Sequence, residues 1–385
     1  MRPFTIHATK AIWFGPGVAG TPAQDIASLL GPRVIVVTDA GITRLRLAGP
    51  FIAALEKAGA TVAVFDGVLP EPPDMNIETA ADMARDMSAT GVVGFGGGSA
   101  MDVAKVVALV VGSSQTLSQV YGVNVATGPR LPLVLVPTTA GTGSEATPVA
   151  IVVASRTKKG VISPHLLPDA AILDPELTLG LPPAVSAATG IDAMVHAIEA
   201  YTSISPNRNP ISRGLAQQAL RLLGGNLRRV VDHGDDIGAR SAMLLGSFLA
   251  GQAFANSPVA AVHALAYPVG GRFHIAHGVS TGLMLPHVMR FNLPEARRDY
   301  TTIASDIFPD LAAASEVTRA EAMIDALSDL VPAIGLPTTL QAIGVPESSL
   351  PDMAGEAMQQ GRLLINNPRP VTLEDALRIY QAAFG

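Results

Sequence analysis

Cysteine is absent from this chain of 385 residues. Structural disulfides, iron–sulfur clusters and cysteine-ligated zinc are therefore excluded, so any metal site must use histidine and carboxylate side chains. The chain also lacks a block of basic residues and carries a formal net charge of −6. This charge argues against nucleic acid as the main partner.

Membrane-spanning and secretory segments are lacking as well. The longest apolar runs, such as AKVVALVVG, are too short to cross a bilayer. The first residues, MRPFTIHATKAIWFGPG, contain neither an apolar signal core nor a cleavage pattern. We therefore expect a cytoplasmic protein without a membrane partner.

Aromatic residues make up only 4% of the chain, so its core must be packed mainly with Ala, Val, Leu and Ile. A hydrophobic content of 48% and a charged content of 15% are typical of a globular enzyme and not of a disordered chain. The length exceeds what one hydrophobic core usually supports, which favours two domains.

The N-terminal half alternates short β-branched runs with helical stretches. The runs that predict strands are 33–41, 61–68, 91–97 and 131–139, and those that predict helices are 48–58, 77–90 and 102–111. Apolar strands that alternate with helices indicate a parallel sheet covered on both faces. The sequence therefore predicts an α/β domain over residues 1–180.

The pattern changes after the Leu181-Pro-Pro break. From there on, β-branched runs are few, and long Ala- and Leu-rich stretches such as SRGLAQQALRLLGGNLRRVV predict helices. We expect an all-helical domain over residues 181–385.

Two histidine-bearing segments of this second domain suggest a metal site. Asp192 and His196 stand four residues apart in TGIDAMVHAIEAY, so on a helix both side chains lie on one face. His263 and His277 lie in VHALAYPVGGRFHIAHG, and four of the 8 histidines fall within residues 263–287. One such pair recurs by chance, and a lone histidine is more often a core or surface residue. The second histidine cluster therefore favours a metal site over chance. Three imidazole nitrogens and one carboxylate oxygen suit Fe, Zn, Ni or Co better than Mg or Ca.

A glycine-rich turn, GFGGGSAMDVAK (94–105), lies between a predicted strand and a predicted helix. Glycines let backbone N–H groups approach a phosphate, and a helix N-terminus adds partial positive charge. A tight turn would also explain the glycines. The usual dinucleotide fingerprint is not met, because its last glycine position is Ser99 and the candidate acid, Asp39, precedes the loop. Asp39 is a candidate to bind a ribose diol and favour NAD over NADP, or simply to cap a turn.

A second polar loop, PTTAGTGSE (137–145), follows the fourth predicted strand and has four hydroxyl side chains within seven residues. Small hydroxyls and glycines suit close contact with a phosphate, a ribose or a flat ring. A plain turn rarely needs so many hydroxyls.

Together these stretches resemble the iron-dependent (group III) alcohol dehydrogenases. The match covers essentially the whole chain, and its most specific stretches are GFGGGSAMDVAK, PTTAGTGSEAT, LLPDAAILDPELT, TGIDAMVHAIEAYTS and HGVSTGLMLPHVMRFN. The resemblance implies an N-terminal dinucleotide-binding α/β domain and an all-α C-terminal metal-binding and catalytic domain. This is the dehydroquinate synthase-like architecture, with the active site in the cleft between the domains.

The resemblance also implies two sets of site residues. A divalent ion, either Fe²⁺ or another such as Zn²⁺, would be held by Asp192, His196, His263 and His277. NAD would be contacted by Asp39, Gly97, Gly98, Ser99, Asp102, Thr138, Thr139, Thr142 and Lys158. Because members of the family are often dimers or larger, we expect a homodimer or a larger homo-oligomer.

The chain departs from the family pattern near the third ligand. Many members carry histidine where this chain has Tyr267, and glycine often stands where it has Ala260. Tyr titrates near pH 10, so it is a poor proton relay at neutral pH. His274 is then the first candidate for the relay, although a surface role is as plausible, and Phe254 and Tyr267 are candidates to wall the substrate pocket.

These observations predict a metal-dependent oxidoreductase that transfers a hydride between NAD(H) and a small alcohol, aldehyde or ketone. A close alternative is hydroxyacid–oxoacid transhydrogenase or 4-hydroxybutyrate dehydrogenase activity, for which Arg272 would bind the substrate carboxylate. Glycerol dehydrogenases and dehydroquinate synthase share the architecture but would differ in ligand pattern. A non-catalytic nucleotide- or metal-binding protein would not require ligands from two separate segments.

Overall fold

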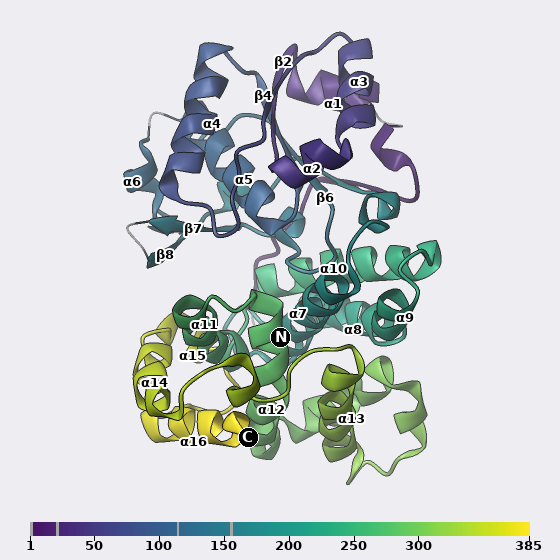
Figure 1. Cartoon of the computed structure of the whole chain (residues 1–385), viewed down its shortest axis with the longest axis vertical. Helices are drawn as coiled ribbons and strands as arrows, with labels where there is room; N and C mark the ends of the chain where they lie inside the picture. Colours follow the sequence, from purple (N-terminus) through teal and green to yellow (C-terminus); the bar gives the residue numbers. More distant parts are fainter. Residues whose placement is uncertain (1–2, 21–22, 114, 155–156) are drawn as a thin grey trace. The chain divides into compact units, whose positions relative to one another are not determined.

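The computed structural model describes the chain apart from residues 1–2, 21–22, 114 and 155–156, and the side chains at 23, 154, 157 and 158 are also outside the description (Figure 1). Contacts divide the chain into two compact units, His7–Gly180 and Leu181–Gly385, the second of which includes the residues before His7. That short N-terminal segment is held by Asn207, whose side chain accepts a hydrogen bond from the Thr5 N–H and donates one to the Thr5 carbonyl, both at 2.9 Å.

A six-stranded sheet forms the centre of the first unit, and all its ladders are parallel. In spatial order its strands are β1 (Ala11–Phe14), β9 (Ala170–Leu173), β6 (Leu133–Pro137), β4 (Gly91–Gly96), β2 (Arg33–Val37) and β3 (Thr61–Phe65). The predicted parallel sheet is confirmed, and β2, β3, β4 and β6 lie within the four predicted runs. β1 and β9 were not predicted, because each has only four residues.

Helices cover both faces of this sheet, as the sequence predicted. They are α1 (Ala23–Leu30), α2 (Ala40–Leu45), α3 (Gly49–Lys57), α4 (Asp74–Asp86), α5 (Gly98–Gly112) and α6 (Leu117–Val120). Successive side chains of a strand point to opposite faces. Ile35 and Val37 of β2 accordingly pack in the cluster that includes α4 and α5, whereas Val34 and Val36 pack in the cluster that includes α1 and α3.

A second, three-stranded sheet was not predicted. It pairs β5 (Gly122–Val123), β8 (Thr157–Ile162) and β7 (Val149–Ala154), with β7 and β8 antiparallel. The described residues also form the 3-10 helices η1 (Val18–Gly20), η2 (Ser144–Ala146), η3 (Pro164–Leu166), η4 (Pro175–Thr178), η5 (Pro309–Ala313), η6 (Gln341–Ile343) and η7 (Glu347–Ser349).

The second unit is helical, and residues 181–385, all of which are described, contain no strand. Its helices are α7 (Pro183–Thr202), α8 (Pro210–Gly224), α9 (Leu227–Asp232), α10 (Ile237–Asn256), α11 (Ala261–Phe273), α12 (His277–Ile307), α13 (Arg319–Ala333), α14 (Leu350–Met358), α15 (Gly361–Leu364) and α16 (Leu373–Phe384). The fold class predicted from the sequence is therefore confirmed. Within the described residues, no helix is both long and apolar enough to span a membrane.

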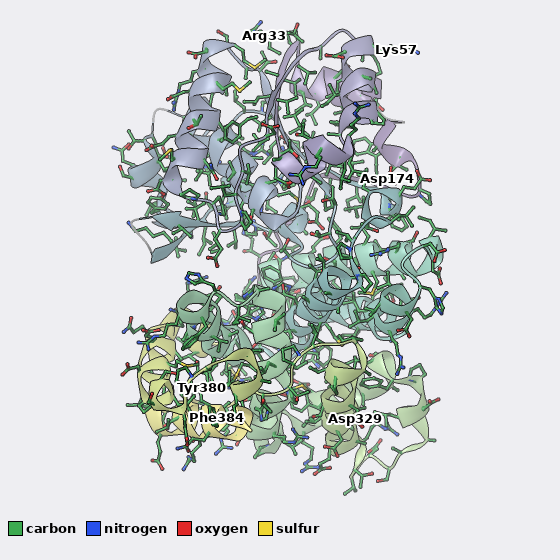
Figure 2. All side chains as sticks on the ribbon, viewed as in Figure 1. Arg33, Lys57, Asp174, Asp329, Tyr380 and Phe384 are labelled. Atoms are coloured by element: carbon green, nitrogen blue, oxygen red, sulfur yellow. The ribbon has the colours of Figure 1, made fainter. Side chains whose placement is uncertain are left out.

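Helix α7 is the central helix of this unit. It is buried on nearly all sides and packs against α8, α10 and α12. The first turn of α12 approaches it so closely that a Cβ atom on Gly278 would lie 1.9 Å from the carbonyl oxygen of Ala188. Tyr380 of α16 is labelled in Figure 2. Its hydroxyl donates to the Leu265 carbonyl of α11 at 2.7 Å.

Candidate metal centre and cofactor loops

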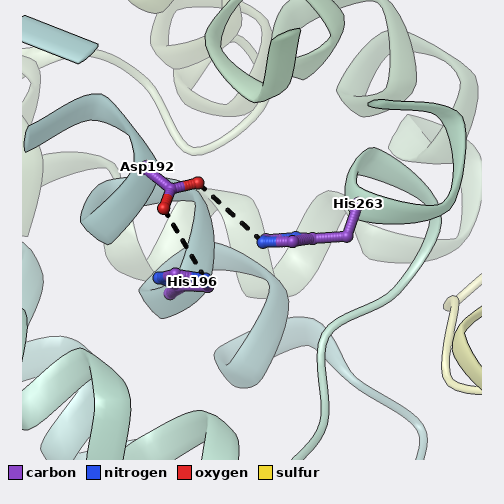
Figure 3. A group of neighbouring side chains, drawn as sticks. All are labelled: Asp192, His196 and His263. Carbon is purple, nitrogen blue, oxygen red and sulfur yellow. Dashed lines mark ion pairs between the residues drawn. The ribbon is translucent and has the colours of Figure 1, made fainter. Parts of the chain in front are cut away.

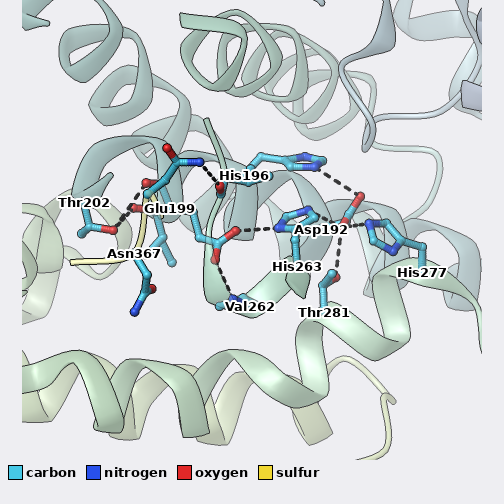
Figure 4. A network of polar contacts seen from close by, with 12 residues as sticks. Asp192, His196, Glu199, Thr202, Val262, His263, His277, Thr281 and Asn367 are labelled. Atoms are coloured by element: carbon cyan, nitrogen blue, oxygen red, sulfur yellow. Dashed lines mark hydrogen bonds and ion pairs between the residues drawn. The ribbon is translucent and has the colours of Figure 1, made fainter. Parts of the chain in front are cut away.

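Three helices of the second unit bring the four predicted metal ligands together. Asp192 and His196 lie one turn apart on α7, His263 lies in the first turn of α11, and His277 is the first residue of α12. All four side chains face one another in Figure 4. The prediction that both histidine-bearing segments meet is thus borne out by their positions, while their role as ligands stays a prediction.

The Asp192 carboxylate lies among the three imidazoles. Its Oδ2 is 4.0 Å from the Nε2 of His196, and its Oδ1 is 4.0 Å from the Nε2 of His263 and 3.6 Å from that of His277. Ligands about 2.0–2.2 Å from a tetrahedral ion are about 3.4 Å apart. One atom each from Asp192, His196 and His263 lies within 4.8 Å of the others, a spacing that fits one ion after small shifts (Figure 3).

The four side chains differ in exposure. Asp192, His196 and His263 are buried, with side chains 4%, 7% and 3% exposed, whereas the side chain of His277 is 37% exposed. The centre is therefore closed on the side of α7 and open on the side of His277. An open side is typical of catalytic metal sites, which keep a position for water or substrate.

Glu199 contacts the His263 ring and the backbone beside it. Its Oε2 lies 2.6 Å from His263 Nδ1, and its Oε1 accepts a hydrogen bond from the Val262 N–H at 2.7 Å (Figure 4). With Nδ1 donating to this carboxylate, the Nε2 lone pair of His263 faces Asp192. Among the described residues, this buried Nε2 has no hydrogen-bond partner. A buried imidazole nitrogen that faces a carboxylate without a partner fits a cation between them.

The imidazoles around Asp192 stabilise its negative charge. Burial alone would raise the pKa of Asp192, but the imidazoles of His196, His277 and His263, together with the Thr281 hydroxyl, lower it overall. Thr281 donates its hydrogen bond to Asp192 Oδ1 at 3.0 Å. Asp192 is therefore held as a carboxylate, the protonation state that binds a metal ion.

Five aromatic rings form a continuous row through the centre. Ring centroids are separated by 4.5 Å between Phe254 and His196, 4.7 Å between His196 and His263, 5.3 Å between His263 and His277, and 5.9 Å between His277 and Tyr267. Phe254 and Tyr267 thus lie at the two ends, each against a histidine ring. Both residues predicted to wall the substrate pocket lie beside the candidate metal centre.

In the first unit, the glycine turn connects β4 to α5. Gly96 has a φ of 151°, a conformation that favours glycine, and Gly97 caps α5 without a side-chain hydrogen bond. The first N–H groups of α5, including that of Ser99, have no partner within the helix and carry the positive end of its dipole. The turn therefore offers the backbone donors that a phosphate group requires.

The second polar loop lies directly against this glycine turn. A Cβ atom on Gly98 would be only 2.8 Å from Cγ2 of Thr142, and one on Gly97 would be 3.6 Å from Oγ1 of Thr139. Thr138, at the start of this second loop, is buried. The structure thus brings together the two loops that the sequence singled out.

Asp39 follows β2 at the same edge of the sheet. Its Oδ1 caps α2 by accepting hydrogen bonds from the N–H groups of Gly41 at 2.8 Å and Ile42 at 3.1 Å. A Cβ atom on Gly96 would lie 3.5 Å from its Oδ2, so this second oxygen is beside the glycine turn. The capping role and the ribose-binding role that the sequence left open are therefore compatible, because they use different oxygens.

Asp102, on the helix that follows the glycine turn, links this turn to the second polar loop. Its Oδ1 accepts a hydrogen bond from the Ser144 hydroxyl at 2.6 Å, and its Oδ2 accepts one from the Ile151 N–H at 2.9 Å. Both oxygens are therefore engaged with the protein, and this geometry favours a role in shaping the loops over a direct contact with NAD.

Comparisons with known proteins identify the family of this chain. Residues 9–175 match the model described as iron-containing alcohol dehydrogenase, and residues 186–384 match that of the Fe-containing alcohol dehydrogenase family, C-terminal. The chain belongs to the iron-containing alcohol dehydrogenase family. It is 41% identical to long-chain-alcohol dehydrogenase 1 of Geobacillus thermodenitrificans, over 96% of this chain and 94% of that protein.

Solved structures give the same result for this dehydrogenase. A 1,3-propanediol oxidoreductase superposes with a TM-score of 0.95 at 35% identity, covering 100% of both chains. Sulfoacetaldehyde reductase from Bifidobacterium kashiwanohense, solved in complex with NAD⁺, superposes with a TM-score of 0.88 at 30% identity, covering 100% of this chain and 99% of that one. The enzymes of this family use NAD(H) and a divalent metal ion, and the chain has a matching cluster of candidate ligands.

Three further predicted residues lie as follows in the dehydrogenase. His274 ends α11 in a left-handed conformation with a φ of 54°, and its side chain is exposed. Arg272 is paired with Glu356 at 2.7 Å and with Asp352 at 3.5 Å, so its charge is already engaged. Lys158 lies in β8, but its side chain is outside the described residues.

Sequence reasoning missed three buried charged residues of the dehydrogenase. Glu199 was overlooked although it stands in the same motif as Asp192 and His196, one further turn along α7. Lys105 lies in α5 and Glu145 ends the second polar loop; burial lowers the pKa of Lys105 to about 8 and raises that of Glu145 to about 7. The position of Lys105 within the apolar run AKVVALVV could have indicated that this lysine is buried.

Proposed function

We propose that this dehydrogenase transfers a hydride between NAD(H) and a small neutral alcohol or its aldehyde. The observation that carries the proposal is the convergence of three imidazole nitrogens on the carboxylate of Asp192, with the buried Nε2 of His263 lacking a partner among the described residues. A divalent ion bound there supplies Lewis acidity toward the substrate oxygen.

In this proposal the chain's own residues hold, orient and enclose the reactants. Asp192, His196, His263 and His277 form the ligand set, and Phe254 and Tyr267 cover the two ends of the ring row. Burial raises the pKa of Tyr267, so its hydroxyl keeps its proton at neutral pH. Tyr267 therefore serves as a hydrogen-bond donor and wall, and we keep the exposed His274 as the candidate proton relay.

The first unit supplies the nucleotide site of the proposal. The pyrophosphate of NAD is assigned to the N–H groups at the start of α5, and a ribose diol is assigned to Oδ2 of Asp39. Thr138, Thr139 and Thr142 contribute hydroxyls from the second loop, where Thr139 and Thr142 lie beside Gly97 and Gly98 of the glycine turn.

A neutral substrate is favoured over a hydroxyacid by the state of Arg272. This side chain was the candidate cation for a substrate carboxylate, but Glu356 and Asp352 already neutralise it. Two of the three named relatives, a long-chain-alcohol dehydrogenase and a 1,3-propanediol oxidoreductase, support the same substrate class, whereas the substrate named for the third, sulfoacetaldehyde, is an anion. We further expect a homodimer or larger homo-oligomer, which sedimentation of the purified protein would reveal.

The experiment that tests the proposal is an alcohol panel with Fe²⁺-loaded protein and NAD⁺. Ethanol, 1,2-propanediol, 1,3-propanediol, a long-chain alcohol and 4-hydroxybutyrate are compared by the rate of NADH formation. We expect kcat/KM for the best neutral alcohol to exceed that for 4-hydroxybutyrate about tenfold or more, about 1.4 kcal/mol in transition-state binding. A preference for 4-hydroxybutyrate would overturn the substrate class, and no NADH from any alcohol would overturn the activity.

A further inference from the structure

Glu199 is a buried acidic residue of the second unit whose side-chain contacts lie on another helix. It lies on α7, one turn beyond His196, and only 4% of the residue is exposed. Both of its carboxylate oxygens contact α11: Oε2 lies 2.6 Å from His263 Nδ1, and Oε1 accepts the Val262 N–H at 2.7 Å. The two oxygens of one buried carboxylate thus contact two consecutive residues of another helix.

This arrangement fixes the ring of His263 in two ways. The hydrogen bond to Nδ1 determines the tautomer, because the carboxylate accepts only, and so it leaves the lone pair on Nε2. The second hydrogen bond, to the neighbouring backbone N–H, holds the carboxylate itself in position. The buried Nε2 then faces Asp192 Oδ1 at 4.0 Å with no hydrogen-bond partner among the described residues.

We propose that Glu199 is a positioning residue of the metal centre, which orients His263 and raises the basicity of its Nε2. The inference rests on the proposed metal site. Carboxylates that accept a hydrogen bond from a ligating histidine typically strengthen metal binding by about 10- to 100-fold. Glu199 does not touch the ion or the substrate and acts only through His263.

Replacement by glutamine separates positioning from simple packing. Glu199→Gln keeps the shape of the side chain but has one acceptor oxygen, whereas the two contacts require two. If that oxygen keeps the Val262 bond, the amide donates to Nδ1 and moves the ring proton to Nε2, which blocks the ligand atom. If it keeps the His263 bond, the Val262 N–H loses its acceptor, and a neutral amide replaces the carboxylate charge.

The test is the affinity of the apo protein for Zn²⁺, measured at one fixed pH by competition with a chromophoric chelator. We expect Glu199→Gln to bind Zn²⁺ about 10- to 100-fold more weakly than the wild type. Thr202→Val is the matched control, because Thr202 is buried on the same helix and its hydroxyl donates to the Ile198 carbonyl of that helix. It should bind Zn²⁺ as the wild type does.

A double variant tests whether Glu199 acts through His263. Adding Glu199→Gln to His263→Ala should lower Zn²⁺ affinity no further than His263→Ala alone, because the ring on which Glu199 acts is gone. Independent, additive losses would contradict the positioning role. Glu199→Asp serves as a second single variant: its shorter side chain keeps the charge but does not span both contacts, so a partial loss is expected.

The outcomes separate this inference from the proposed function. If the wild type binds Zn²⁺ and Glu199→Gln binds it equally well, Glu199 is only a packing residue and the inference is wrong. If the wild type does not bind Zn²⁺, or if His263→Ala binds it as tightly as the wild type, the metal centre itself is wrong.

Discussion

At the residue scale, the sequence indicated the four candidate ligands but not Glu199, which contacts one of them, His263. The spacing of Asp192 and His196 puts both on one helix face, and this local rule needs no tertiary information. The contact between Glu199 and His263 joins residues 64 apart along the chain. Such a contact depends on how α7 and α11 pack, so no local pattern could predict it.

Loss of a single metal ligand should lower turnover and leave the affinity for NAD⁺ unchanged. We expect His263→Ala to lower kcat/KM for the best alcohol at least about a hundredfold, beyond the usual effect of a supporting contact. NAD⁺ affinity, measured by calorimetry, should remain near the wild-type value, because the proposed nucleotide site is built from residues of the first unit. A variant with most of its activity intact would remove His263 from the ligand set.

The choice between NAD and NADP should depend on the charge of Asp39. Asp39→Asn retains an N-cap acceptor for α2 but removes the charge that repels a 2′-phosphate. We expect the ratio of kcat/KM for NADP⁺ to that for NAD⁺ to rise roughly tenfold or more, about 1.4 kcal/mol. Asp39→Gly should act in the same direction. An unchanged ratio in both variants would show that Asp39 only caps the helix.

At the element scale, long periodic segments were predictable and short ones were not. The valine-rich runs of β2, β4 and β6 are buried on both faces, and continuous apolar runs are the usual signature of such strands. β1 and β9 have four residues each and β5 has two, which is too few for a periodic pattern. The order of the strands also had to come from the structure, because pairing is a long-range property.

The close approach of α12 to α7 gives a prediction about stability. Gly278→Ala would place a methyl group 1.9 Å from the Ala188 carbonyl oxygen, so the first turn of α12 must shift. We expect a loss of about 3 kcal/mol in the free energy of unfolding, the upper end of the usual overpacking cost.

Urea denaturation measures this loss, and Gly214→Ala provides the control. Gly214 lies within α8, and a Cβ atom there meets nothing within 4 Å. Alanine is the better helix former, so Gly214→Ala should be neutral or stabilise the protein by up to about 1 kcal/mol. Equal effects of the two substitutions would contradict the packing argument.

At the scale of the whole molecule, buried charge should make stability depend on pH. Burial raises the pKa of Glu145 to about 7, above the ordinary value near 4.5, in spite of the nearby Lys105. Between these two values the folded state holds a proton that the unfolded state has released. Stability must therefore fall as pH rises through this window, by an amount on the order of 3 kcal/mol.

The comparison of the wild type with Glu145→Gln isolates this effect. The variant lacks the titrating group, so it should gain stability relative to the wild type between about pH 5 and about pH 7, as measured by urea unfolding. Lys105, whose pKa burial lowers to about 8, contributes to pH dependence above this window. Parallel stability profiles for the two proteins would show that Glu145 is not held in its neutral form.

The central claim is that one divalent ion, bound by Asp192, His196, His263 and His277, is required for NAD-linked alcohol oxidation. The most direct test measures metal content and NADH formation on the same samples: as purified, after complete removal of metal, and after Fe²⁺ is restored. We predict about one ion per chain, loss of activity with loss of metal, and recovery on reloading. Undiminished alcohol oxidation by the metal-free protein would contradict the account.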